Sequence, residues 1–375
     1  MKDIRLNKLA KLLVNYSAKV QKGDFVFVMC DEVATQWAKE VVKEAIIAGA
    51  HVETLISSGE IGEIKLKHSS KEQLQESNFL LEQMLSKADV WLTAWGTKNT
   101  RMNTNIDSEK IKFSMQGAKS WRKIYSERMA DGSLRWCGTQ FPTNADAQEA
   151  SMSLEDYEDF VYGAGLLDKE DPVAEWKAVS AKQERWVKYL DTKKELHIIS
   201  KGTDIKVKVD ERKWINCDGQ VNFPDGEIFT SPVDDKIDGI ISFSFPGIYS
   251  GKEIEGIKLT VEKGLVVKAE AEKGVDILHE LLKVDEGSSR FGEVAIGTNY
   301  GIKNFTRNML FDEKIGGTVH MAIGDSMAEA GGTNNSSLHW DMLCDMRDGG
   351  KIFADGELFY QNGEFLDKIL DKMGL

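Results

Sequence analysis

Two of the six histidines stand in segments whose residue types suit metal chemistry. His339 begins a His-Trp-Asp tripeptide, so Asp341 lies two residues further on, and His320 follows a Gly-Gly-Thr-Val run. Because strand side chains alternate between two faces, an extended segment would place His339 and Asp341 on the same face. Imidazole nitrogen and carboxylate oxygen are ordinary ligands of divalent first-row metals. The spacing therefore indicates a candidate metal site.

Two glutamates add to this candidate site. Glu227 lies in NFPDGEIFTSP and Glu293 in RFGEVAIGTN, and each precedes apolar residues where a solvated strand face would alternate. The competing interpretation is an ordinary surface acid at the start of a strand. The remaining histidines have positions typical of structural or surface residues: His51, His68, His197 and His279.

The elements that must position these residues follow two different patterns. Up to about residue 190, helical and buried-strand patterns alternate, which predicts a βαβ arrangement and a mostly parallel sheet. Helices are expected over 3–18, 34–48, 70–87, 107–118, 153–165 and 172–190, with strands at DFVFVMC, HVETLI and DVWLTAWG.

From Glu195 the hydrophobic period becomes two, broken by glycines, as in short antiparallel strands joined by tight turns. The segment KIFADGELFYQNGEFL predicts a hairpin through Gln361-Asn362-Gly363. We therefore expect an α/β domain over 1–192. An α+β domain with antiparallel meander strands, carrying the metal site, should follow over 193–375.

The composition limits the class of protein. The chain has 375 residues, a mass of 42.0 kDa and a net charge of −13, with 41% apolar and 29% charged residues. An acidic surface repels phosphates, so the sequence argues against nucleic acids and anionic membranes as partners but tolerates cations.

The cysteines and the N-terminal segment bear on the compartment. The four cysteines are scattered without a Cys-x-x-Cys pair, the first twenty residues resemble an amphipathic helix rather than a signal peptide, and no apolar stretch is long enough to span a membrane. We expect a cytoplasmic protein with reduced thiols.

Other enzyme classes lack their motifs. No G-x-G-x-x-G or G-x-x-x-x-G-K-[ST] follows the first strand, where DEVATQ stands instead, and the glycine-rich 330–337 has no following lysine. No G-x-S-x-G is present for a serine hydrolase. A nucleotide enzyme and a serine hydrolase are thus the weaker alternatives.

Five segments in order resemble the M29 family of metallo-aminopeptidases, and the likeness extends through nearly the whole chain. They are RWCGTQFPTNADAQEASMSLEDYEDFVYGA, NFPDGEIFTSPVDD, FGEVAIGTN, LFDEKIGGTVHMAIGDS and NNSSLHWDML. The resemblance implies a cytosolic, homodimeric exopeptidase that removes N-terminal residues from short peptides with a free amino terminus. It also implies two divalent metal ions, for which cobalt, zinc or magnesium serve in different members.

The resemblance assigns roles position by position. The implied metal ligands are Glu227, Glu293, His320, His339 and Asp341. One bridging carboxylate, Glu227 or Glu293, would hold both ions. A non-bridging carboxylate would take the proton of the attacking water; Glu227, Glu253 and Glu329 are the candidates, and Glu227, Glu293 and Glu329 are the expected catalytic residues.

One position departs from the family pattern. The family has a tyrosine seven residues after the first ligand histidine, and this chain has Met327, although Glu329 two residues further on is retained. A thioether is a poor partner for a hard metal centre and donates no hydrogen bond. The alternative function is therefore a drifted member that binds metal or peptide without efficient turnover. Tyr300 is an aromatic hydroxyl nearby in sequence.

Overall fold

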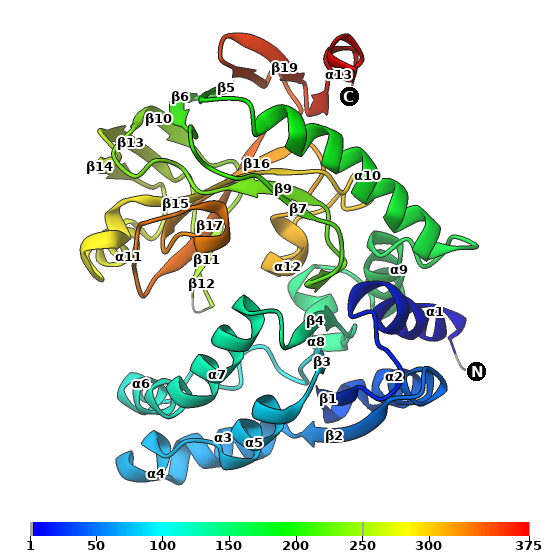
Figure 1. Cartoon of the computed structure of the whole chain (residues 1–375). Coiled ribbons are helices and arrows are strands. Elements are labelled where there is room, and N and C mark those ends of the chain that lie inside the picture. The colour runs from blue at the N-terminus through cyan, green and yellow to red at the C-terminus, as the bar shows by residue number, and fades with distance from the viewer. Residues whose placement is uncertain (1–2, 250, 375) are drawn as a thin grey trace. The chain divides into compact units, whose positions relative to one another are not determined.

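The computed structural model describes residues 3–249 and 251–374, and the chain forms two compact units (Figure 1). Unit 1 comprises residues 1–175 and 219–224, and unit 2 comprises residues 176–218 and 225–375. The chain leaves unit 1 between Glu175 and Trp176, earlier than the expected boundary at 192. The segment 219–224 then returns to unit 1.

Unit 1 is built around a parallel sheet, sheet A, with the strand order β2-β1-β3-β4-β8. Its strands are β1 (Phe25–Asp31), β2 (His51–Ser57), β3 (Val90–Trp95), β4 (Arg135–Gln140) and β8 (Asn222–Phe223). Its helices are α1 (Ile4–Leu12), α2 (Thr35–Ile47), α3 (Gly59–His68), α4 (Lys71–Gln75), α5 (Phe79–Lys87), α6 (Ser108–Gly117), α7 (Lys119–Ala130), α8 (Asn144–Glu149) and α9 (Leu154–Ala164). The parallel sheet confirms the α/β prediction.

The helix expected over 70–87 is two helices, α4 and α5. Asn78 interrupts it, because its side chain accepts a hydrogen bond from the backbone N–H of Leu81 at 3.2 Å and so caps α5. The sequence interpretation also missed α3, which has no buried residue, and α7, which carries a weak apolar stripe.

The 19-residue helix α10 (Pro172–Leu190) agrees with the expected bounds. Pro172 stands at its first position and Asp171 accepts the N–H of Ala174 at 3.0 Å, which together define a helix start. Trp176 and Trp186, both in the part of α10 that belongs to unit 2, are buried. Trp186 packs on Tyr189 and Phe365. The two tryptophans are therefore core residues.

Unit 2 contains two larger antiparallel sheets. Sheet B has the strand order β14-β13-β10-β6-β5-β18-β19-β20, and sheet C has the order β17-β16-β15-β9-β7. The strands of sheet B are β5 (Glu195–Ser200), β6 (Thr203–Lys208), β10 (Ile237–Ser242), β13 (Lys258–Glu262), β14 (Leu265–Glu270), β18 (Lys351–Ala354), β19 (Glu357–Gln361) and β20 (Glu364–Phe365). The antiparallel pairing confirms the expected α+β class.

Sheet C carries the residues singled out from the sequence. Its strands are β7 (Ile215–Cys217), β9 (Glu227–Thr230), β15 (Phe291–Gly297), β16 (Thr318–Gly324) and β17 (His339–Asp345). The small pair β11 (Gly247–Tyr249) and β12 (Lys252–Ile254), with helices α11 (Val275–Leu281), α12 (Met309–Asp312) and α13 (Lys368–Met373), completes unit 2. One continuous buried cluster joins side chains of sheets B and C and of α10 and α11.

The C-terminal segment forms two turns rather than one. Asp355-Gly356 joins β18 to β19, and Asn362-Gly363 joins β19 to β20. Asn362 and Gly363 have φ of 53° and 80°, the left-handed values that a two-residue hairpin turn requires. The predicted turn at Asn362-Gly363 is therefore confirmed. Asp355-Gly356 forms a second two-residue hairpin turn, which was not predicted.

Candidate metal centre

Strand alternation in sheet C places the candidate ligands on one face. Ala322 of β16 lies opposite Glu293 of β15 and Asp341 of β17, while His320 lies two residues before Ala322. Since side chains two residues apart share a face, these ligands project together. The small side chain of Ala322 leaves room between the two carboxylates. The opposite face carries Met321, Ile323 and other apolar residues of the core cluster.

The side chains converge closely. Nε2 of His320 lies 3.3 Å from Oε2 of Glu227 and 3.4 Å from Oε1 of Glu293. Nε2 of His339 lies 3.3 Å from Oε2 of Glu293 and 3.5 Å from Oδ1 of Asp341. Glu293 therefore turns one oxygen toward each histidine. All but His339 are at least nine-tenths buried.

The ligand atoms fall into two groups that share one residue. Glu227, Glu293 and His320 form one group, and Glu293, His339 and Asp341 form the other; within each group the atoms lie within 4.8 Å of one another. All five residues predicted as ligands are thus brought together by the fold.

Backbone geometry fixes two of these residues. Nδ1 of His339 lies 2.9 Å from the carbonyl oxygen of Asp325, which can only accept, so Nδ1 carries the proton and Nε2 faces the carboxylates. Glu227 follows Gly226, whose φ is +121° and whose missing Cβ would lie 2.8 Å from Cβ of Asn299. A larger residue at 226 would therefore displace the start of β9.

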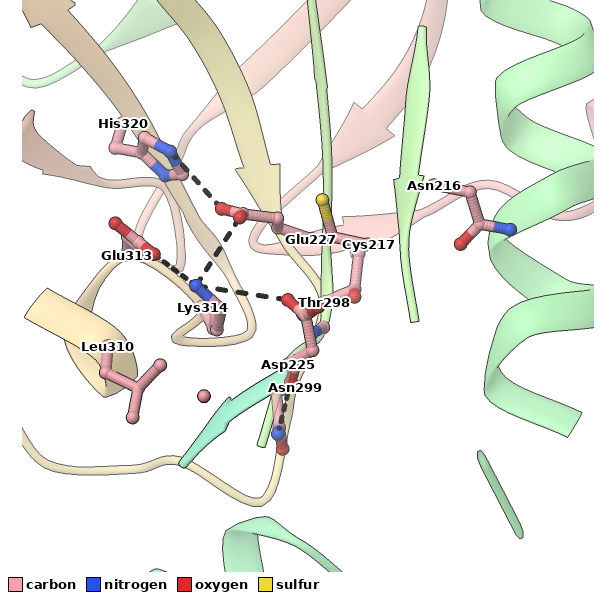
Figure 2. A network of polar contacts seen from close by, with 12 residues as sticks. Asn216, Cys217, Asp225, Glu227, Thr298, Asn299, Leu310, Glu313, Lys314 and His320 are labelled. Atoms are coloured by element: carbon pink, nitrogen blue, oxygen red, sulfur yellow. Dashed lines mark hydrogen bonds and ion pairs between the residues drawn. The ribbon is translucent and has the colours of Figure 1, made fainter. Parts of the chain in front are cut away.

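A buried lysine completes the polar network, as Figure 2 shows. Lys314 is fully buried and lies 3.4 Å from Oε1 of Glu227 and 3.9 Å from Oδ1 of Asp225; it also forms an ion pair with Glu313. Cys217, Asp225 and Glu227 are a third group within 4.8 Å. Because the ammonium already pairs with two of its members, Lys314 supplies the cation there.

Neither Glu313 nor Lys314 was singled out from the sequence. Both lie in the quoted segment LFDEKIGGTVH, but a Glu-Lys dipeptide is usually a solvated surface pair. The available signal was the apolar and glycine context around the pair, which predicts burial.

The remaining candidates lie outside the two groups. Glu329 is exposed on the single turn Ala328–Ala330, and Glu253 pairs with Arg307 at 2.7 Å and Lys273 at 3.5 Å. The hydroxyl of Tyr300 donates to the carbonyl of Gly363 at 3.0 Å, so it is engaged at the β19–β20 turn.

Met327 packs with Phe229 and Ala295. Ala295 and Phe229 share the face of Glu293 and Glu227, because each lies two residues further along its strand.

Burial and charge shift the protonation of the site. Burial raises the pKa of Glu227 despite the neighbouring Lys314. Burial alone would lower the pKa of His320 and of His339, but the facing carboxylates raise both above the ordinary value. The same contacts outweigh burial at Glu293 and lower its pKa. Without a metal ion, His320 and His339 are therefore expected to carry positive charges that compensate the facing carboxylates.

The residues present fit a divalent metal ion. Oε2 of Glu227 and Nδ1 of His320 are buried without a hydrogen-bond partner in the described part of the chain. Buried polar atoms are nearly always satisfied, so a buried carboxylate oxygen that makes no hydrogen bond, and only a 3.3 Å contact with an imidazole nitrogen, needs an explanation. A cation beside converging carboxylates and imidazoles supplies one.

The donor set is suited to a divalent metal ion, and comparison with known proteins identifies the family. The family model for thermophilic metalloproteases (M29) matches residues 2–365, so the chain belongs to the M29 family. It is 28% identical to aminopeptidase AmpS of Bacillus subtilis, covering 96% of this chain and 98% of that protein. It is 27% identical to aminopeptidase 2 of Geobacillus stearothermophilus, covering 92% of each.

A solved structure shares the fold. The structure titled wild-type AmpT from Thermus thermophilus matches with a TM-score of 0.85 and 22% identity, over 98% of this chain and all of that one. The fold expected from the resemblance is thereby confirmed for the chain as a whole.

Proposed function

We propose that this chain is a metal-dependent aminopeptidase that removes the N-terminal residue of short peptides. The carrying observation is Glu293, whose two carboxylate oxygens face the two histidines of the two ligand groups. Membership of the M29 metalloproteases and the likeness to curated aminopeptidases support the same activity. The alternative of a drifted, inactive member has no support from these relatives.

Two divalent ions would fit the arrangement, with Glu293 as the carboxylate shared by the two ligand groups. Glu227 would serve one group, because Lys314 engages its Oε1 and leaves Oε2 facing His320. The remaining ligands would be His320 in one group and His339 with Asp341 in the other. When bound, such ions activate water as a nucleophile and polarise the scissile carbonyl. Cobalt, zinc and magnesium are the candidate ions.

Glu313, which is partly buried and pairs with Lys314, is our candidate for the residue that accepts the proton of the attacking water. Its pKa is raised, mainly by burial, and the negative charge of Asp341 adds to this effect while Lys314 opposes it. A buried carboxylate with a raised pKa is a better base near neutral pH than a solvated one. Glu329, which is exposed, is the second candidate and is suited to bind the ammonium of a peptide.

Assembly and location follow from the family resemblance. We propose a homodimer in the cytoplasm. Among the described residues, no helix is both long and apolar enough to cross a membrane. The net charge of −13 also disfavours nucleic-acid partners.

The test is hydrolysis of unblocked dipeptides and aminoacyl anilides by chelator-treated protein, with and without added cobalt, zinc or magnesium. We expect metal to restore release of the N-terminal residue and N-acetylation of the substrate to stop it. Folded protein that hydrolyses nothing with any of these metals would contradict the proposal. Continued cleavage of acetylated substrate would indicate an endopeptidase or amidase instead.

A further inference from the structure

Unit 1 contains a cavity of about 750 Å³ that the proposed catalysis does not use. It lies at the carboxyl ends of β1, β3 and β4, beside α7, with lining residues that include Asp31, Trp95 and Gln140, the last residues of those strands. Sheet A begins at β1, adds β2 on one side and then β3 on the other. In parallel sheets ligands bind outside the carboxyl ends of the strands where the order reverses. The cavity occupies this position.

Aromatic rings form one wall of the cavity. Trp136 contacts Trp91, Trp95 and Tyr125 with ring centroids 5.7 to 6.0 Å apart, and Trp121 of α7 also lines the space. Trp95 is held against Gly138, where an added Cβ would lie 2.3 Å from the Trp95 ring. Trp95 nevertheless remains 41% exposed. It is therefore a fixed ring with an uncovered surface.

The charges around the cavity favour a cation over an anion. Asp31 and Asp146 contribute carboxylates to the lining. Asp31 also accepts the N–H groups of Val33 at 3.3 Å and Gly59 at 3.0 Å. These two backbone donors beside β1 are therefore not available to an anion. Phosphate-binding sheets keep such donors for the ligand. Among the described lining residues the basic side chain is Arg122, which lies over the Trp121 ring at 5.5 Å.

We propose that this cavity binds a small organic cation, an ammonium group carried on an apolar body. Aromatic faces attract cations through the negative charge of their π systems, and indole is the strongest of the common rings. The apolar body would occupy the tryptophan wall, and the carboxylates of Asp31 and Asp146 would favour the charge. The ammonium can belong to a free amine or to the amino terminus of a peptide, since the two share this chemistry.

The probe is choline, titrated into the metal-loaded enzyme by calorimetry, with 3,3-dimethyl-1-butanol as the uncharged ligand of the same shape. We expect saturable choline binding and binding of the alcohol at least about tenfold weaker. Trp95→Leu should weaken choline binding about fivefold or more. The matched control is Phe79→Leu, an exposed ring on α5 outside the cavity lining, which should leave it unchanged.

Three outcomes would overturn the proposal: no saturable choline binding, equal binding of choline and the alcohol, or equal affinity in wild type and Trp95→Leu. If Trp95→Leu does not fold, Asp31→Asn replaces it; the amide oxygen can still accept one of the two backbone N–H groups that Asp31 accepts, and the charge is removed, so choline affinity should fall. Unchanged affinity in that variant also contradicts the proposal.

Competition binding then separates the two sources of the ammonium. Displacement of bound choline by an unblocked dipeptide, but not by its N-acetylated form, assigns the cavity to peptide amino termini. Saturable choline binding that no peptide displaces assigns it to a free amine. Choline binding is measured without turnover, so its result stands even if the aminopeptidase proposal fails.

Discussion

Sheets A and C assemble functional groups in opposite ways. Sheet A is parallel, and its cavity is built where β1, β3 and β4 end and their loops begin. Sheet C is antiparallel, and its candidate metal ligands project from one face, held in register by the pairing of β15, β16 and β17. The residue positions at a strand-end site can vary with the length and conformation of its loops. On a sheet face, the relative positions of the side chains are fixed by the strand register.

The two regions also differ in how they handle charge. The cavity in unit 1 combines aromatic rings with two carboxylates and is in part exposed. The site in unit 2 buries several carboxylates and compensates them with Lys314 and two histidines. Burial makes each unpaired charge costly, so the unit 2 site should be much less tolerant of substitution.

The largest expected effect is the loss of the shared carboxylate. Glu293→Ala should lower kcat/KM by about a thousandfold or more, since both ligand groups lose a member. Bound metal, measured by elemental analysis, should fall in the same variant. Glu253→Ala is the matched control, because Glu253 pairs with Arg307 outside both groups, and its activity should stay near wild type. Near-normal metal content in Glu293→Ala would remove Glu293 from the centre.

The second effect concerns the buried cation. Lys314→Met should lower the free energy of unfolding by about 3–5 kcal/mol, because Glu227, Glu313 and Asp225 lose their compensating charge. Lys268→Met, in an exposed ion pair on β14, should change stability by no more than about 0.5 kcal/mol. Denaturant unfolding of both variants measures the difference. Equal stabilities would show that Lys314 is dispensable to the network.

The third prediction concerns the pH dependence of metal affinity. The raised pKa values of His320 and His339 keep both rings protonated at neutral pH without metal, and binding must displace those protons. Affinity should therefore rise with pH, by about tenfold per pH unit for each proton displaced. Competition with a chelator at pH 6, 7 and 8, corrected for the chelator's own protonation, measures it. Affinity independent of pH would contradict the assignment.

The smallest effect is expected in unit 1. Gly138→Ala would place a Cβ 2.3 Å from the Trp95 ring and should destabilise the protein by about 1–3 kcal/mol, because the ring must move. Metal content should remain unchanged. Gly163→Ala in α9 is the control: its Cβ meets nothing within 4 Å, and alanine favours a helix, so it should be neutral or stabilising. Thermal unfolding compares the two.

Much of sheet C could be predicted because period-two alternation and short motifs report local geometry. His339 and Asp341 share a face for the reason their spacing indicates, and Glu227 and Glu293 stand at interruptions of the apolar pattern. The charge network could not be predicted in the same way. The apolar and glycine context around Lys314 indicates burial, but its partners Asp225 and Glu227 are distant in sequence, so the ion pairs themselves could not be predicted.

The sequence also could not distinguish Glu227 from Glu293 as the shared carboxylate. Both glutamates lie beside apolar runs, and our proposal for Glu293 depends on the position of Lys314 against Oε1 of Glu227. The break between α4 and α5 and the helix α7 depended on a local cap and on tertiary packing, which hydrophobic periodicity does not report.

The path of the chain between the two units limits how the protein can be divided or recombined. It passes between the units after Glu175, after Asp218 and after Pro224, because β8 pairs with β4 of sheet A. A fragment starting at residue 193 would lack Gln183, whose amide donates to the carbonyl oxygens of Cys217 and Glu227. A single genetic crossover near residue 193 would therefore combine β7 and β9 of one relative with α10 of another, although Gln183 of α10 binds both strands. The two units are expected to be inherited together.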